Sequence, residues 1–489
     1  MTGKEIDYAN EFIDFVNSSP TPYHAVHSIK KKLLEAGFEE LNEAKPWHEK
    51  LVNGGKYLVT RNESSIVAFT VGQNYENGEG VAIVGAHTDS PCFRIKPISR
   101  IVSEGFIQIG VELYGGLIAH TWFDRDLTVA GRVYINDRKS GQFLPKLVKI
   151  DKPLMRIPTL AIHLNREANT KFEFNKETKL VPIAGQISEE EKHVGTKESG
   201  FCCEGKGNGL SLQEFDSLQA VVQRHNRSLV DMIARQLDVA VDDIEDFELL
   251  LCDHQKATLG GLYDEFIFSP RLDNLNSCFC ATKSLIDSSK DLSQQKGISL
   301  ISLFDHEEIG SVSAQGAEST FLPDVLQRIA SKDFSGSGIT GETYHRLIAS
   351  SFLLSSDMAH GIHPNYSEFY ESKNKPQVNG GPVIKINANQ RYATNSAGVV
   401  LIKKCASLRN VPLQLFVVRN DMPCGSTIGP LLAARLGIRT LDLGNPQLSM
   451  HSIRETGGTF DIIKLCDLFS SYFDNYSSVN DSLSLHITA

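Results

Sequence analysis

Short apolar runs alternate with longer segments of helical periodicity over the second half of this chain, and this alternation restricts the fold more than any other feature. Each run has the length and apolar content of a buried strand. The runs cover 298–304, 352–356, 413–418 and 440–443, and the expected helices cover 274–288, 395–408, 427–436 and 459–476. Strands and helices in this order predict an α/β fold, with a mixed, mostly parallel sheet covered by helices on both faces.

The first part of the chain predicts further elements of the same domain. Apolar residues at helical spacing indicate helices over 5–17 and 23–36. A hairpin is expected next, with strands near 57–60 and 66–71, and a buried strand over 81–86 follows it.

The middle of the chain has a different texture, from about residue 92 to about residue 250. It combines strand-like runs with glycine pairs, and its polar stretch is expected to be a loop. Its segments are strands at 107–113 and 129–135, the polar stretch at 185–210, a helical part at 215–237, and a strand at 247–252 that returns the chain to the first domain. We therefore expect residues 1–91 and 254–489 to form one discontinuous domain, with 92–253 as an inserted, mainly β domain.

Two adjacent glutamates, Glu307 and Glu308, closely follow the apolar run 298–304. A strand there places both carboxylates at its carboxyl end, where the ligands of open α/β sheets bind. Neighbouring residues at a strand tip point in different directions, so one could hold a metal ion while the other moves a proton. The alternative is a solvated acidic turn.

More residues of the kinds that bind metal ions lie beside strand-like segments of the same domain. Each alone has an ordinary alternative, such as a helix N-cap for Asp273 or a core position for His451. Together, two imidazoles and three carboxylates suit two divalent ions that share one bridging carboxylate. The candidate ligands are His87, Asp273, Glu308, Asp357 and His451.

Two carboxylates remain outside that ligand set. Asp89 follows His87 closely enough to orient its imidazole through the second ring nitrogen. Glu307 stands beside a candidate ligand without being one, which is the natural position of a general base in metal-assisted hydrolysis. The sequence around it lacks the second histidine of the H-E-x-x-H motif, so a zincin is excluded.

Charge and hydropathy exclude several other classes of function. The 49 basic and 59 acidic residues give a net charge of −10 without any basic block, which disfavours binding to nucleic acids or anionic membranes. The N-terminal residues lack the pattern of a signal peptide, and no apolar run approaches membrane-spanning length. We expect a soluble cytoplasmic protein whose nine cysteines mostly fill the core rather than form disulfides.

The motifs that carry these residues resemble those of the dinuclear zinc aminopeptidase family that includes the aspartyl and the vacuolar aminopeptidases. The resemblance covers essentially the whole chain, with the motifs in the family's order. The matching stretches are Gly85-Ala86-His87-Thr88-Asp89-Ser90-Pro91, Pro270-Arg271-Leu272-Asp273-Asn274, Asp305-His306-Glu307-Glu308-Ile309-Gly310-Ser311, Ser356-Asp357-Met358-Ala359-His360 and Met450-His451-Ser452-Ile453-Arg454-Glu455.

The resemblance implies a specific distribution of two Zn²⁺ ions per subunit, one of which could exchange for another divalent ion. His87 and Asp357 are implied to hold one ion, and Glu308 and His451 the other. Asp273 is implied to bridge both. The implied fold is that of a zinc exopeptidase.

The same resemblance implies roles outside the metal ligands. Glu307 matches the general base and Asp89 the acid that orients a histidine. A basic substrate pocket maps onto Lys385, with His360 and Tyr392 nearby. A lone lysine on a strand is normally solvated, but one that follows an apolar run could pair with an acidic side chain.

The inserted domain is implied to be a dimerisation domain. His163 matches a histidine that the family lends to the active site of a neighbouring subunit, and the family assembles into a tetrahedral dodecamer. Relatives are delivered to the vacuole, although we see no propeptide here that would direct such delivery.

The resulting hypothesis is a metalloaminopeptidase that removes N-terminal Asp or Glu from peptides. The acidic preference depends on Lys385, and the net charge of −10 should repel acidic peptides at long range. Two alternatives stay open: another cocatalytic zinc exopeptidase or deacylase, and a non-catalytic, self-assembling scaffold or cargo protein.

Overall fold

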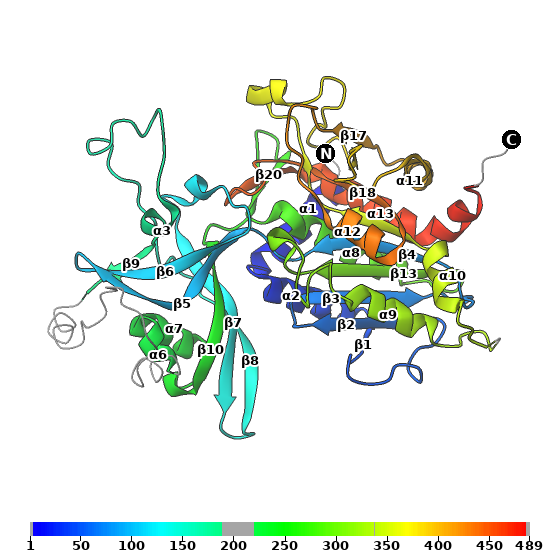
Figure 1. Cartoon of the computed structure of the whole chain (residues 1–489), viewed down its shortest axis with the longest axis horizontal. Helices are drawn as coiled ribbons and strands as arrows, with labels where there is room; N and C mark the ends of the chain where they lie inside the picture. Colours follow the sequence, from blue (N-terminus) through cyan, green and yellow to red (C-terminus); the bar gives the residue numbers. More distant parts are fainter. Residues whose placement is uncertain (1–2, 188–219, 337, 486–489) are drawn as a thin grey trace. The chain divides into compact units, whose positions relative to one another are not determined.

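A computed structural model describes residues 3–187, 220–336 and 338–485. The chain divides into two compact units (Figure 1). Unit 1 comprises Met1–Ser90 and Ala257–Ala489, and unit 2 comprises Pro91–Lys256. Most of the polar stretch 185–210 lies outside the described residues.

Unit 1 is built on a nine-stranded sheet of order β1-β2-β3-β13-β4-β14-β18-β16-β17. Its central strands β13, β4 and β14 run parallel to one another. The described antiparallel pairs of this sheet are β2-β3, β3-β13 and β16-β18. The expected mixed, mostly parallel sheet is therefore confirmed. The strands are β1 (Glu39–Glu40), β2 (Lys56–Arg61), β3 (Ser65–Val71), β4 (Val81–His87), β13 (Ile298–Phe304), β14 (Phe352–Ser356), β16 (Val383–Ile386), β17 (Gln414–Val417) and β18 (Arg439–Gly444).

Helices cover both faces of this sheet because alternate residues of its buried strands point to opposite sides. Ile301 and Leu303 of β13 pack in one apolar cluster, and Ile298 and Leu300 pack in the other. The first cluster includes residues of α1 (Gly3–Ser18), α2 (Pro22–Glu35), α8 (Leu272–Ser288), α11 (Ser396–Leu408) and α13 (Thr459–Asp481). The second includes residues of α9 (Phe321–Ala330), α10 (Thr343–Ser350) and α12 (Ile428–Leu436).

A second, five-stranded sheet of unit 1 was not expected from the sequence. Its order is β11-β12-β20-β19-β15, and its strands are only two to four residues long, too short to show an apolar period. They are β11 (Thr258–Gly260), β12 (Phe266–Ser269), β15 (Ala359–His360), β19 (Pro446–Leu448) and β20 (Glu455–Gly458). Short 3-10 helices, η3 (Glu307–Ile309) and η4 (Pro364–Phe369), complete the unit.

Unit 2 contains a six-stranded antiparallel sheet of order β8-β7-β10-β5-β6-β9. The strand expected at 247–252 is part of β10 and pairs with β5 and β7 inside this sheet, rather than with the sheet of unit 1. The strands are β5 (Cys92–Ser103), β6 (Phe106–Tyr114), β7 (Leu127–Asp137), β8 (Gln142–Lys149), β9 (Ile183–Gln186) and β10 (Ile244–Asp253). Short helices are η1 (Ala119–Trp122), α3 (Lys176–Lys179) and η2 (Val241–Asp243).

The helical part expected over 215–237 consists of two helices in its described residues, α6 (Val221–Arg224) and α7 (Arg227–Leu237). Residues 215–219 lie outside the described residues. The break has a local cause, because the side chain of Asn226 accepts a hydrogen bond from Ser228 N–H and starts a new helix as its N-cap. None of the helices in the described part of the chain combines the length and apolar character needed to cross a membrane.

Candidate metal centre

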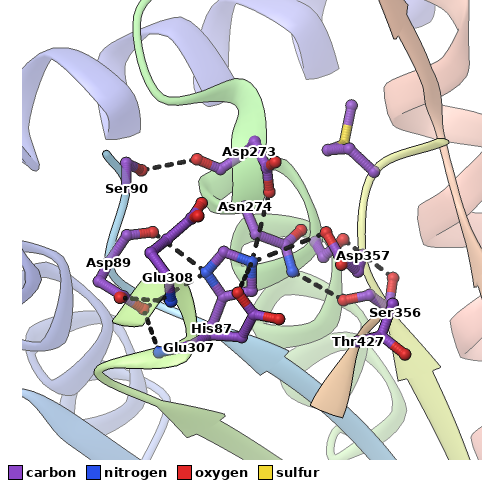
Figure 2. A network of polar contacts seen from close by, with 12 residues as sticks. His87, Asp89, Ser90, Asp273, Asn274, Glu307, Glu308, Ser356, Asp357 and Thr427 are labelled. Carbon is purple, nitrogen blue, oxygen red and sulfur yellow. Dashed lines mark hydrogen bonds and ion pairs between the residues drawn. The ribbon is translucent and has the colours of Figure 1, made fainter. Parts of the chain in front are cut away.

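The carboxyl ends of the three central parallel strands bring most of the candidate ligands together. Phe304 of β13 pairs in register with His87, the last residue of β4, so η3 with Glu307 and Glu308 begins beside His87. Asp357 directly follows β14, which pairs with β4 on the other side. Figure 2 shows these side chains converging around the His87 ring.

Asp273 and His451 reach the same place from segments next to the small sheet. Asp273 follows β12 near the start of α8, but its backbone is not helical, with φ −80° and ψ 109°. Arg271, not Asp273, is the N-cap residue of α8, so the N-cap alternative for Asp273 was wrong. His451 lies between β19 and β20 with a left-handed φ of 66°.

Asp273 presents one carboxylate oxygen to each histidine. Its Oδ1 lies 3.3 Å from Nε2 of His87, and its Oδ2 lies 3.5 Å from Nε2 of His451. On the first side, Nε2 of His87 is also 3.6 Å from Oδ1 of Asp357. On the second side, Nε2 of His451 is 3.4 Å from Oε2 of Glu308. The four other predicted ligands thus lie around the Asp273 carboxylate.

This donor set fits divalent metal ions. Three groups of side chains each place three donor atoms close enough for one ion. They are His87 with Asp273 and Asp357, Asp273 with Glu308 and His451, and His87 with Glu307 and Glu308. A tetrahedral zinc ion with bonds of about 2.0–2.1 Å separates its ligand atoms by roughly 3.4 Å, close to the separations observed here. Oδ1 of Asp273 and Oε1 of Glu308 are buried without a hydrogen-bond partner among the described residues. Buried oxygens of this kind are suited to bind a cation.

Asp89 is fully buried and lies beside the His87 ring (Figure 2). Its carboxylate lies 3.4 Å from Nδ1 of His87, whereas Asp273 and Asp357 approach the other ring nitrogen, Nε2. The same carboxylate accepts hydrogen bonds from the backbone N–H groups of Glu307 and Glu308, each at 3.1 Å. Asp89 therefore fixes the position of the His87 imidazole relative to the backbone of Glu307 and Glu308.

Burial and crowded charges shift the pKa values of this cluster. Burial raises the pKa of Glu307 to about 8. Burial, with the nearby Asp273 carboxylate, also raises the pKa of Glu308 well above its usual value. Burial favours neutral His87, but the carboxylates of Glu307, Asp273 and Asp357 outweigh it and hold the His87 pKa well above its usual value. A cluster that retains protons in this way has an excess of negative charge that a cation would neutralise.

The predicted pocket residues lie on the Asp357 side of the cluster. Lys385 of β16 is 2% exposed, and its Nζ lies 3.7 Å from Oδ2 of Asp357 and donates a hydrogen bond to Met358 O at 3.1 Å. The Lys385 ammonium also lies 5.1 Å from the centre of the Tyr392 ring. His360 is exposed and packs its ring edge on Phe416.

Of the predicted site residues, His163 alone belongs to unit 2. It lies in a turn after Ile157 and is exposed.

Glu455 also supports the site, although the sequence assigned no role to it. It is 2% exposed and hydrogen-bonds the backbone at Asp273 and at His451. The sequence offers one weak signal for this role. Glu455 is a charged residue immediately before Thr456 and two glycines.

Comparison with known proteins decides the family. The model of the aminopeptidase I zinc metalloprotease family, M18, matches residues 15–473. This chain belongs to the M18 family. The resemblance inferred from the five motifs is confirmed, and an M18 member of this kind is a zinc-dependent metalloaminopeptidase.

Relatives of this M18 aminopeptidase match it over nearly their whole length. Aspartyl aminopeptidase 4 of Saccharomyces cerevisiae is 54% identical over 98% of this chain and 96% of its own. Aspartyl aminopeptidase of Aspergillus oryzae is 52% identical over 97% of each chain.

Solved structures share the fold of this M18 chain. The cryo-EM structure of the Ape4 and Nbr1 complex has a chain that is 48% identical, with a TM-score of 0.90 over 99% of this chain and 88% of that one. The Saccharomyces cerevisiae mApe1 dodecamer is 30% identical, with a TM-score of 0.83 over 99% of this chain and 100% of that one.

Proposed function

We propose that this M18 aminopeptidase removes N-terminal Asp or Glu residues from peptides, with two zinc ions in each subunit. The observation that carries the proposal is the two-sided placement of Asp273 between His87 and His451. Asp357 completes the ligands on the His87 side, and Glu308 completes those on the His451 side. The names of the two relatives support the acidic specificity.

When bound, the two zinc ions supply Lewis-acid polarisation of the scissile carbonyl and acidify the attacking water. Glu307 is the residue placed to take the proton of that water, because its carboxylate lies 3.9 Å from Nε2 of His87 and its side chain remains 15% exposed. It then passes the proton to the departing amine of the product. Asp89 contributes indirectly, by orienting the His87 ring and the backbone of Glu307.

Lys385 is the candidate for recognition of the acidic side chain. An ammonium group has three donors, and in the described structure one is directed at Met358 O and another faces Asp357. The remaining donor could bind a substrate carboxylate, and the buried position of Lys385 strengthens such a charge-assisted bond. Tyr392 and His360 would form other parts of the pocket wall.

Cleavage of Asp-, Glu- and Leu-initiated chromogenic peptides tests this function directly. The protein is assayed as purified, after chelation, and after zinc is restored. Metal-dependent release confined to the acidic substrates is expected, and N-acetylated versions should resist cleavage because a free α-amine is required. Cleavage of the blocked peptides would favour a deacylase or another exopeptidase, and absence of all cleavage would favour a scaffold protein.

We further propose that the subunits form a tetrahedral dodecamer and that unit 2 is its dimerisation domain. The mApe1 relative is a dodecamer, and exposed apolar residues Leu160, Ile162 and Leu164 flank His163 in unit 2. Light scattering should give twelve times the chain mass of 54.0 kDa. If His163 serves a neighbouring active site, His163→Ala should lower turnover without lowering the assembled mass.

We also propose a cytoplasmic protein that can be delivered to the vacuole, since Ape4, a similar protein, forms a complex with Nbr1. Imaging of a fluorescently tagged chain in growing and in starved cells tests this localisation. Signal that stays outside the vacuole under both conditions would contradict delivery.

A further inference from the structure

Glu455 joins two segments that carry candidate metal ligands. Its carboxylate accepts a hydrogen bond from the backbone N–H of Asp273 at Oε2, at 3.1 Å. Its Oε1 accepts another from the backbone N–H of His451, at 2.9 Å, and a third from the side-chain amide of Gln447, at 3.2 Å. One buried carboxylate thus contacts the main chain on both sides of the metal centre without being a candidate ligand.

Packing alone does not explain the placement of Glu455, because burial of a carboxylate is costly. Glu455 is 2% exposed, and it forms no ion pair with a Lys, Arg or His side chain in the part of the chain that the structure describes. Its hydrogen-bond donors are neutral. A neutral apolar residue would avoid this cost if the position served packing alone.

The two backbone groups that Glu455 binds belong to unusual conformations. His451 has φ 66° and Ser449 has φ 59°, a left-handed region that is unfavourable for residues other than glycine. Asp273, with φ −80° and ψ 109°, lies at a kink near the start of α8. Both conformations aim a candidate ligand at the metal centre, and the Glu455 carboxylate is positioned to hold both in place.

Asp89 shows the same arrangement on the other side of the centre, where it binds the backbone N–H groups of Glu307 and Glu308. We propose that Glu455 is a positioning residue that fixes Asp273 and His451 as one unit and thereby sets the affinity of the ion position formed by Asp273, Glu308 and His451. This inference rests on the proposed two-zinc site. The ion position at His87 and Asp357 shares only Asp273 with it and depends less on Glu455.

Glu455→Gln tests the proposal with little change in shape. The amide retains one acceptor oxygen but turns an NH₂ group toward one of the two backbone N–H donors, so one segment loses its anchor. Zinc affinity is measured by competition with a chromogenic chelator, and Co²⁺ absorption spectra report the coordination of each ion. We expect a loss of affinity of roughly 10–100-fold for one of the two ions and a much smaller loss for the other.

Asp461→Asn is the matched control. Asp461 is also a buried carboxylate that accepts two backbone N–H groups, those of Asn379 and Gly381, but neither belongs to a candidate ligand. This variant should lose thermal stability and keep both zinc affinities. If it weakens the same ion as Glu455→Gln does, the effect is general loosening of the fold, and the proposal is overturned.

The wild-type protein separates failure of this inference from failure of the proposed function. Wild type that binds fewer than two ions contradicts the two-zinc site, whereas two tight ions in both wild type and folded Glu455→Gln contradict only the role of Glu455. Hydrogen exchange of metal-free wild type adds a test that needs no variant to fold. Peptides that contain the Asp273 and His451 amides should be protected without metal, and exchange as fast as in exposed loops would overturn the proposal.

Discussion

His87 and Asp273 meet atom to atom, with Nε2 of His87 3.3 Å from Oδ1 of Asp273, and the other oxygen of that carboxylate faces His451. A carboxylate shared in this way couples two ion positions. Asp273→Asn should therefore weaken both zinc ions, by at least about 100-fold in affinity, because a neutral amide replaces the shared anion. Metal analysis after dialysis against a chelator measures the effect.

Asp357→Asn is the comparison for that experiment. Of the two candidate histidine ligands, Asp357 lies close to His87 and not to His451, so its substitution should weaken one ion far more than the other. Equal loss of both ions in this variant, or retention of either ion in Asp273→Asn, would contradict the bridging role.

Glu307→Gln should separate metal binding from catalysis. The amide keeps the size of the side chain but cannot accept a proton from water, so turnover should fall by about 10²–10⁴-fold. Zinc content should remain that of the wild type, because five other residues supply the ligands. Activity close to wild type with full zinc content would remove Glu307 from the mechanism.

Lys385→Ala should lower activity on acidic substrates more than activity on a neutral substrate. Cleavage of Asp- and Glu-initiated substrates should fall at least about 10-fold more than cleavage of a Leu-initiated substrate, because a charge-assisted bond to the side-chain carboxylate is lost. Zinc content must be measured in parallel, since Nζ of Lys385 also lies 3.7 Å from Asp357. A uniform loss with depleted zinc would make Lys385 a support of Asp357 instead of a selectivity residue.

His225 makes the stability of unit 2 depend on pH. Burial, with Arg224 nearby, lowers the pKa of His225 to about 4, against about 6.5 in an unfolded chain. The folded protein holds the neutral ring, which contacts Ser99 Oγ at 2.8 Å. His225 therefore contributes stability that is fully present above pH 6.5 or so and is lost as the pH falls toward about 4.

Thermal unfolding of wild type and His225→Asn checks this dependence. The stability difference between them should be larger at about pH 7.5 than at about pH 5, since acid removes only the wild-type contribution. His48→Asn, at an exposed position, serves as the surface control. A difference that does not vary with pH would exclude His225 as the source.

The sequence predicted the large sheet well because its central strands are continuous apolar runs. Four of the site residues, His87, Glu307, Glu308 and Asp357, stand at or just after the ends of these runs. β13 and β14 have the bounds expected, 298–304 and 352–356. The small sheet escaped prediction because β15 and β19 span two and three residues, too few for an alternation of apolar and polar residues to repeat. The break at Asn226 was missed because helical periodicity outweighed a single capping residue.

The contribution of Glu455 could not be derived from sequence for a different reason. Its partners are backbone N–H groups of Asp273 and His451, and a pattern of side chains does not indicate which backbone donors a fold leaves available. Asp89 was noticed only because it stands two residues from His87. Its bonds to the Glu307 and Glu308 backbone required the structure.

The candidate ligands are spread from His87 to His451 of a 489-residue chain, and the last of them is needed to complete the second ion position. A polypeptide still emerging from the ribosome therefore lacks the assembled centre until synthesis has passed His451. Fragments that end before His451 should therefore be inert, because the order of synthesis delays the last ligand until the other four have been made.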